Sequence, residues 1–333
     1  LPFLATLRIP RCTRLRDATY CIDPEIKPEL LHEYSGPEPP NTAPCPRRSC
    51  SGVADGGHRV TAQPAALGTI DTTTVQIDGR AVRVGVRPGK GRPLLLINGI
   101  GANLELLAPV MHSLDGIETI AFDVPGVGGS ALPWSPYRMS GLARLVDRML
   151  ARLGYQGAVD VLGLSWGGAL AQQFAITCKT RCHKLVLAAT TPGALMVPGS
   201  PLILAKMFNS RRYTDIAYLR RIAPSLYGGE VRRNPGLVEN HRSLVVRPHW
   251  RGYLYQQLAL CGWSSLPWFL RQRTLVLAGN DDPLVPLINA RLMAKLIPRS
   301  RLEIMDDGHL FLLTHPERVA PLIRGFLAEP LTR

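Results

Sequence analysis

The sequence has few of the features that mark membrane-spanning or disulfide-bonded proteins. No run reaches the ~18 consecutive apolar residues that a transmembrane helix needs. The seven cysteines are odd in number and irregularly spaced, so they match neither a disulfide framework nor a zinc site. The first seven residues, LPFLATL, are too short and broken for the apolar region of a signal peptide. We therefore expect a cytoplasmic protein with reduced thiols.

Acidic residues are also scarce, since 25 Asp and Glu stand against 39 Lys and Arg, a net charge of +14. The arginines are scattered, and zinc-finger spacing, an RNP-like aromatic strand and a basic helix are all missing from the sequence, so we expect no nucleic-acid partner. Residues 193–273 alone hold 12 Lys or Arg and 3 acidic residues. This basic segment could face an anionic lipid or granule surface, or it could be an ordinary solvated face.

Residues 1–66 differ from the rest of the chain. Prolines interrupt polar sequence there, and hydrophobic residues show no sustained period. Such a segment cannot bury enough apolar surface to offset its ordering entropy. We predict that residues 1–66 are a disordered or mis-assigned N-terminal extension and that residues 67–330 form one domain.

Strand and helix patterns alternate from residue 72 onward. Residues 74–77 and 81–86 alternate in polarity around Asp78-Gly79, which predicts a hairpin. Short apolar runs typical of buried strands occupy residues 94–97, 119–122, 159–162, 185–188, 274–277 and 302–305. Helical patterns lie at residues 104–113, 140–153, 167–177, 287–296 and 316–327. This order predicts an α/β fold, a mainly parallel sheet with helices on both faces.

One long gap interrupts the alternation, between the fourth and fifth of those apolar runs. It contains helical patterns and many aromatic residues. A structureless loop of that length would be unusual in a compact domain. We therefore predict a helical cap insertion at about residues 193–272, laid over the edge of the sheet.

The motif Gly163-Leu164-Ser165-Trp166-Gly167 lies where a predicted strand runs into a predicted helix. In a nucleophile elbow, small flanking residues permit the strained turn that exposes a serine Oγ above the sheet. The alternative is a glycine-rich turn whose serine only caps the helix. The position between strand and helix favours Ser165 as a nucleophile.

A serine nucleophile needs a histidine base that is oriented by a carboxylate, and in this arrangement the chain order is Ser, acid, His. His309 follows the last predicted strand and is the candidate base, with His315 as its main rival. Asp281 and Asp282 both follow the preceding predicted strand. We choose Asp282 as the acid. Asp281 is the alternative acid, and if Asp282 is the acid, we expect Asp281 to stabilise the turn.

The tetrahedral intermediate of acyl transfer also needs hydrogen-bond donors for its oxyanion. Residues 98–101, Asn-Gly-Ile-Gly, directly follow the strand at 94–97, where hydrolases often have His-Gly-x-Gly. We predict that the backbone N–H groups of Ile100 and Trp166 bind the oxyanion. A second glycine-rich segment, residues 123–130, lacks Gly-Lys-Ser/Thr, so we expect a structural turn rather than a phosphate loop.

With these motifs assembled, residues 72–326 resemble the intracellular medium-chain-length polyhydroxyalkanoate depolymerases, which are poly(3-hydroxyalkanoate) depolymerases of the α/β-hydrolase superfamily. The matching segments are residues 98–106, 122–130, 164–174, 185–190, 227–229, 262–268 and 306–312. The resemblance implies the α/β-hydrolase fold and places the family's triad on Ser165, Asp282 and His309. Residue 280 is Asn where the family leads us to expect Asp, and the acid assignment does not depend on it.

The resemblance implies hydrolysis of a storage polyester through an acyl-enzyme, with no metal and no organic cofactor. It also implies a polyhydroxyalkanoate granule as partner, and a location in the cytoplasm at the granule surface. Alternatives on the same scaffold are a 3-hydroxyacyl thioesterase or acyltransferase and a general carboxylesterase. A non-catalytic granule-binding or ligand-sensing protein is a further alternative, but it would require a defective triad.

Overall fold

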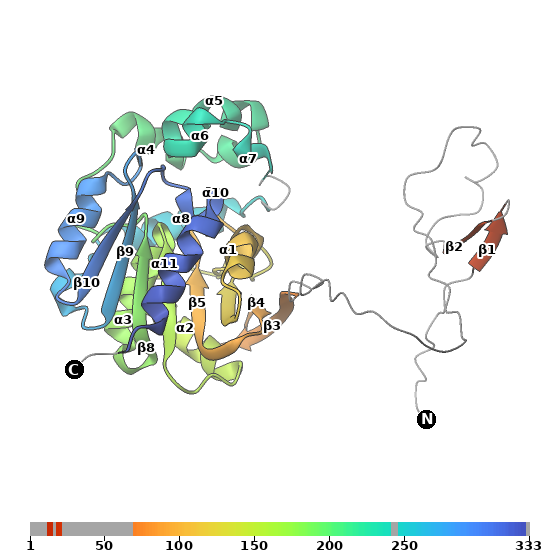
Figure 1. Ribbon diagram of the computed structural model, residues 1–333, viewed down its shortest axis with the longest axis horizontal. Coiled ribbons are helices and arrows are strands. Elements are labelled where there is room, and N and C mark those ends of the chain that lie inside the picture. Colours follow the sequence, from red (N-terminus) through yellow and green to blue (C-terminus); the bar gives the residue numbers. More distant parts are fainter. Residues whose placement is uncertain (1–11, 16–17, 22–68, 241–245, 331–333) are drawn as a thin grey trace, which may run out of the picture. The chain divides into compact units, whose positions relative to one another are not determined.

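The computed structural model describes residues 12–15, 18–21, 69–240 and 246–330 (Figure 1). The chain divides into two units, Leu1–Pro64 and Ala65–Arg333. In the first unit, β1 (Cys12–Leu15) and β2 (Ala18–Cys21) pair antiparallel. The rest of the predicted N-terminal extension, residues 1–66, lies outside the described residues.

An eight-stranded sheet forms the centre of the second unit, in the order β10-β9-β8-β7-β5-β6-β4-β3. Its strands are β3 (Asp71–Ile77), β4 (Arg80–Arg87), β5 (Lys90–Ile97), β6 (Ile117–Phe122), β7 (Val159–Leu164), β8 (Cys182–Ala188), β9 (Arg273–Gly279) and β10 (Ser300–Met305). Strands β5 to β10 run parallel, and β3 and β4 add an antiparallel hairpin at one edge. The hairpin turns at Asp78 and Gly79, which both have positive φ, as such a tight turn requires.

Helices cover both faces of this sheet (Figure 1). On one face lie η2 (Leu104–Leu107), α1 (Ala108–Ser113), α10 (Phe311–Thr314) and α11 (Pro316–Ala328), and on the other α2 (Met139–Arg152), α3 (Trp166–Thr177) and α9 (Leu287–Leu296). A short 3₁₀ turn, η3 (Lys179–Arg181), leads from α3 into β8. Successive residues of each strand point to opposite faces, so Leu94 and Leu96 pack in one cluster and Leu95 and Ile97 in the other. The predicted α/β fold class is confirmed.

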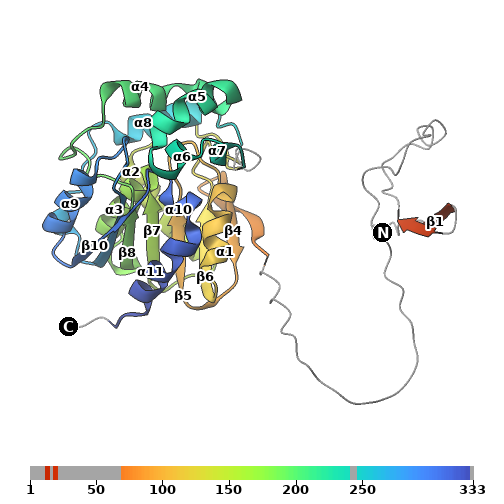
Figure 2. The same cartoon turned by 45° about the horizontal axis from the view of Figure 1, so that its top comes forward.

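The segment between β8 and β9 is helical, and we call residues 193–272 the cap. It contains α4 (Pro201–Phe208), η4 (Ser210–Tyr213), α5 (Ile216–Tyr227), α6 (Gly229–Arg233), α7 (Leu237–Asn240), α8 (Trp250–Leu260) and η6 (Pro267–Phe269). Figure 2 shows α4 to α7 gathered over one end of the sheet. A small core of its own includes Ile222, Leu226 and Val231. In the described part of the chain, no helix combines the length and hydrophobicity needed to cross a bilayer.

The strand order reverses at β5, because β6 pairs with one side of β5 and β7 with the other. Ile97 at the end of β5 is in register with Gly163 near the end of β7. The loops that leave these two strands therefore begin side by side, at the kind of switch point where open α/β sheets bind their ligands.

Candidate active site

Ser165 occupies a strained turn between β7 and α3, with φ 55° and ψ −116°. A Cβ on Gly163 would lie 2.4 Å from the Gly167 carbonyl oxygen, and one on Gly167 would lie 2.1 Å from the Ile97 carbonyl oxygen. Only glycine fits both positions, so these two residues permit the turn. The Ser165 side chain makes no capping hydrogen bond to α3. Its hydroxyl is thus available for other contacts, which disfavours the interpretation as a helix cap.

His309 joins Ser165 to Asp282 through both ring nitrogens. His309 Nε2 lies 3.1 Å from Ser165 Oγ, and His309 Nδ1 lies 2.7 Å from Asp282 Oδ2. The other carboxylate oxygen of Asp282 accepts the N–H groups of Leu284 and Val285, each at 2.9 Å. His309 and Asp282 are both buried. An Nδ1–H that donates to Asp282 leaves Nε2 to accept the serine proton, which is the arrangement a base needs.

The competing residues lie apart from this row of hydrogen bonds. Asp281 accepts the N–H of Gly229 at 2.8 Å and forms an ion pair with Arg232 at 3.0 Å. His315 lies 3.2 Å from Glu317, beyond the last strand. The structure therefore places His309 rather than His315 next to the serine, and Asp282 rather than Asp281 next to His309.

The loop after β5 leaves one backbone donor without a partner. The Asn98 side chain accepts the N–H of the next residue at 2.8 Å, and Gln256 Oε1 accepts the N–H of Gly101 at 2.7 Å. Within the described chain, no group accepts the N–H of Ile100. Trp166 is the first residue of α3, where a helix N–H has no partner within the helix. These are the two N–H groups that the sequence suggests for the oxyanion.

Two residues of the cap form hydrogen bonds with other groups of the two residues that carry these donors. Tyr213 Oη donates to the Ile100 carbonyl oxygen at 2.8 Å, which fixes the plane of the neighbouring peptide. The indole Nε1 of Trp166 donates to the Gln256 carbonyl oxygen at 2.8 Å. No local pattern in the sequence marks Tyr213 or Gln256 for these contacts, because they lie 113 and 90 positions from their partners.

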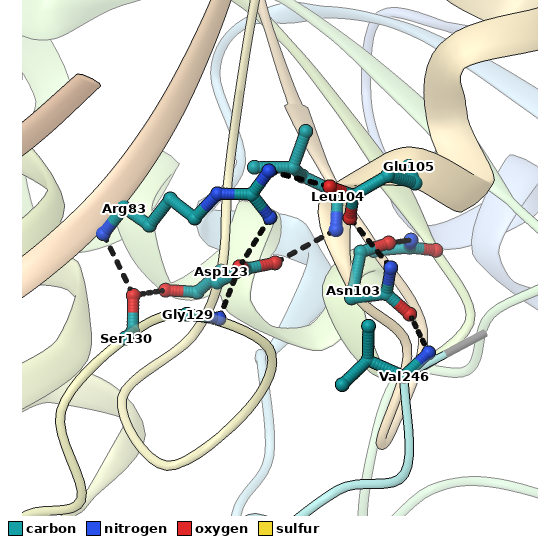
Figure 3. A network of polar contacts seen from close by, with 9 residues as sticks. Arg83, Asn103, Leu104, Glu105, Asp123, Gly129, Ser130 and Val246 are labelled. Carbon is teal, nitrogen blue, oxygen red and sulfur yellow. Dashed lines mark hydrogen bonds and ion pairs between the residues drawn. The ribbon is translucent and has the colours of Figure 1, made fainter. Parts of the chain in front are cut away.

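A polar network lies under the same loop (Figure 3). Asp123 accepts the N–H groups of Leu104 at 2.7 Å and Gly129 at 2.8 Å, and Arg83 lies within 3.4 Å of its carboxylate. Burial raises the pKa of Asp123 above its usual range. The glycine-rich segment that follows β6 is thus hydrogen-bonded, through Asp123, to the loop that follows β5.

Asn103 and Glu105 extend this network toward the cap. Glu105 pairs with Arg83 at 2.5 Å and accepts a hydrogen bond from Asn103 at 2.6 Å. Asn103 also accepts the N–H of Val246 at 2.9 Å, on the cap segment before α8 (Figure 3). Burial works to raise the pKa of Glu105, but the hydrogen bonds from Arg83 and Asn103 outweigh it and hold the pKa below its usual range.

A cavity of about 140 Å³ opens above the serine. Ser165 and His309 form part of its wall together with Arg212 and mostly apolar side chains, which include Leu106, Met207, Leu219, Val231 and Leu310. Such a wall suits an apolar chain that carries a few polar groups. Among the described residues, no cluster of three or more His, Cys, Asp or Glu could hold a metal ion.

Comparisons with known proteins identify the family. A family model of the alpha/beta hydrolase fold matches residues 92–316. A poly(3-hydroxyalkanoate) depolymerase of Ectopseudomonas oleovorans is 55% identical over 265 residues, which cover 78% of this chain and 93% of that protein. The chain belongs to the poly(3-hydroxyalkanoate) depolymerase family of α/β-hydrolases. The resemblance predicted from its motifs is confirmed.

More distant relatives share the α/β-hydrolase fold of this depolymerase family. A 2-hydroxymuconate semialdehyde hydrolase of Pseudomonas putida is 30% identical over 259 residues, which cover 72% of this chain and 89% of that protein. The solved enol-lactonase of Burkholderia xenovorans LB400 has a TM-score of 0.67 at 21% identity, over 77% of this chain and 100% of its own. At that identity, the likeness shows the fold alone.

Proposed function

We propose that this protein is a serine hydrolase that cleaves ester bonds of intracellular medium-chain-length poly(3-hydroxyalkanoate). The continuous row of hydrogen bonds from Ser165 through His309 to Asp282, at the wall of an apolar cavity, carries the chemistry. The depolymerase that is 55% identical supports the choice of substrate.

The proposed reaction has two halves. Ser165 Oγ attacks an ester carbonyl while His309 Nε2 takes the hydroxyl proton, and Asp282 stabilises the resulting imidazolium. The N–H groups of Ile100 and Trp166 bind the oxyanion, His309 returns the proton to the leaving alcohol, and an acyl-enzyme remains. Water, deprotonated by His309, then attacks the acyl-enzyme, and His309 returns the proton to Ser165 Oγ as the acid leaves. Each step uses only water, side chains and backbone groups, so the proposal includes no metal and no organic cofactor.

The outer surface of the cap supports contact with a polyester granule. On α4, Leu202 is 75% exposed and Phe208 52%, and no residue of this helix is buried. Exposed large apolar side chains that gather on one segment often mark an interaction surface. We propose that this apolar surface meets the granule in the cytoplasm, so that polymer can pass from the granule into the cavity.

The arginines of the cap contribute less net charge than their number suggests. Arg211 pairs with Asp215 at 2.7 Å, and Arg233 pairs with Glu230 at 2.9 Å. Arg232 pairs with Asp281 at 3.0 Å. Since these partners neutralise part of the basic segment, the proposal assigns granule contact to the apolar side chains rather than to the arginines.

A substrate comparison tests the proposed function. Purified protein is incubated with a polyhydroxyoctanoate latex and, separately, with 3-hydroxydecanoyl thioesters. We expect loss of latex turbidity and release of hydroxy acids, without consumption of the thioesters. Thioester turnover with an unchanged latex would show a thioesterase or acyltransferase and overturn the proposal.

A further inference from the structure

Within the part of the chain that the structure describes, Arg212 is a buried cation without an acidic partner. Two arginines are buried among the described residues, Arg87 at 3% exposure and Arg212 at 6%. Arg87 pairs with Asp115 at 2.8 Å. No carboxylate in the described part of the chain pairs with Arg212, and its Nε has no hydrogen-bond partner there. A guanidinium stays protonated in proteins, so among the described residues this charge has aromatic faces beside it, with the ring centroids of Tyr213 and Tyr253 at 4.2 and 5.8 Å, but no counter-charge.

Three tyrosine hydroxyls surround the guanidinium. Arg212 Nη1 donates to Tyr227 at 3.0 Å, and Nη2 donates to Tyr253 at 3.3 Å and to Tyr213. These bonds use three of its five N–H groups, since an arginine side chain has five. Neutral phenols satisfy donors but do not neutralise a charge. Burial of a charge without a counter-charge is unfavourable, so an anion bound beside this guanidinium would be stabilised.

One tyrosine side chain connects Arg212 to His309, and another connects it to Ile100. Tyr227, its first partner, stacks on the imidazole of His309 with ring centroids 6.5 Å apart. Tyr213, its second partner, donates to the Ile100 carbonyl oxygen. Arg212 also lines the same cavity as Ser165. An anion bound there would therefore belong to the molecule whose ester is being cleaved.

We propose that Arg212 binds the terminal carboxylate of the polyester chain. This inference rests on the proposed function and adds a direction of attack. A poly(3-hydroxyalkanoate) chain has one anionic group, the carboxylate of its last unit. That carboxylate is four bonds from the carbonyl carbon of the last ester, so both fit into one cavity. The enzyme then acts from the carboxyl end and releases the terminal unit.

The bond changes balance without a further reactant. Ser165 attacks the last ester carbonyl, the bond from the acyl carbon to the ester oxygen breaks, and the terminal unit leaves as a 3-hydroxy acid with the proton from His309. Water then cleaves the acyl-enzyme, and the shortened polymer leaves with a new terminal carboxylate. Each turnover thus creates the group that Arg212 recognises.

Two oligomers that differ only at the carboxyl end test this subsite in the wild-type enzyme. The substrates are the trimer of (R)-3-hydroxyoctanoate with a free carboxylate and the same trimer as its methyl ester. We expect kcat/KM for cleavage of the last inter-unit ester to be about 10–100-fold higher for the free acid, the usual worth of a charge-assisted hydrogen bond. Equal values would overturn the carboxylate subsite and leave the proposed function standing. Hydrolysis of neither trimer would overturn both.

Variants assign the preference to one side chain. Arg212→Met should reduce the ratio of free acid to methyl ester to within about twofold, whatever its overall rate, because the charge is gone. Arg211→Gln is the matched control, since Arg211 is exposed and pairs with Asp215. It should keep the wild-type ratio. If Arg212→Met lowers both rates equally and preserves the ratio, Arg212 only supports the tyrosines and the inference is wrong.

Discussion

At the scale of single residues, the position of Asp282 explains why one of two adjacent carboxylates fits the role of acid. Asp282 has one oxygen on His309 and the other on two backbone N–H groups, so its orientation is fixed. Asp281, the next residue toward the N-terminus, stabilises the start of α6 through Gly229 instead. The two side chains leave the same turn in different directions, which the sequence alone could not specify.

These contacts predict which of two conservative variants loses more activity. Asp282→Asn should lower kcat by about 10⁴-fold, because an amide favours the wrong tautomer of His309. Asp281→Asn, the matched control, should change kcat by less than about tenfold, since Asp281 does not contact the histidine. Steady-state hydrolysis of a p-nitrophenyl alkanoate measures both. The opposite ranking would reassign the acid.

At the scale of elements, the cap and the loop after β5 form one unit around the proposed oxyanion donors. Tyr213 holds the Ile100 carbonyl, and Gln256 accepts both the Gly101 N–H and the Trp166 indole. The cap is therefore more than a cover over the cavity. Any displacement of η4 or α8 would also disturb the donors below.

Removal of the Tyr213 hydroxyl tests whether this side chain positions the loop after β5 or only packs against it. Tyr213→Phe should lower kcat about tenfold with little change in KM, because a full oxyanion donor is worth about 10²–10³-fold and Tyr213 only orients one. Tyr218→Phe is the control, as the Tyr218 hydroxyl has no hydrogen-bond partner among the described residues. Initial-rate kinetics of the two variants test this. Equal effects would show that Tyr213 has no positioning role.

The network under the loop gives a pH-dependent prediction. The folded-state pKa of Glu105 is below its unfolded value of about 4.3, so ionised Glu105 stabilises the fold above that pH, and this contribution is lost as the pH falls through the folded pKa. Glu105→Gln should lower the free energy of unfolding by about 0.5–1 kcal/mol at pH 7, a modest value because the ion pair is partly exposed. The difference from wild type should shrink below about pH 4.

Urea unfolding of the wild-type protein and of Glu105→Gln, from pH 7 to below about pH 4, measures the two free energies of unfolding. Glu317→Gln, at a largely exposed carboxylate, is the control and should stay within about 0.5 kcal/mol of wild type at pH 7. A Glu105→Gln deficit that persists unchanged at low pH would show that the side chain acts through packing rather than charge.

At the scale of the whole molecule, the sequence predicts the strands of the sheet and the helical segment between β8 and β9, but not the cap residues that contact the site. Buried parallel strands read as short apolar runs, and each run lies within an observed strand. The hydrogen-bonded row of Ser165, His309 and Asp282 was predictable because each residue follows a strand end, where local motifs mark it. Arg212, Tyr213 and Gln256 were not, since their roles depend on cap packing between residues far apart in the chain.

The central claim, that Ser165 is the nucleophile, is most directly tested by locating a covalent adduct. The protein is treated with a fluorophosphonate, digested, and analysed by peptide mass spectrometry. We expect phosphonylation of Ser165 in the wild-type protein. In a folded Ser165→Ala variant we expect no adduct, and a rate of latex hydrolysis that is lower by about 10⁵–10⁶-fold. Modification of a different residue, or continued latex hydrolysis by Ser165→Ala, would contradict it.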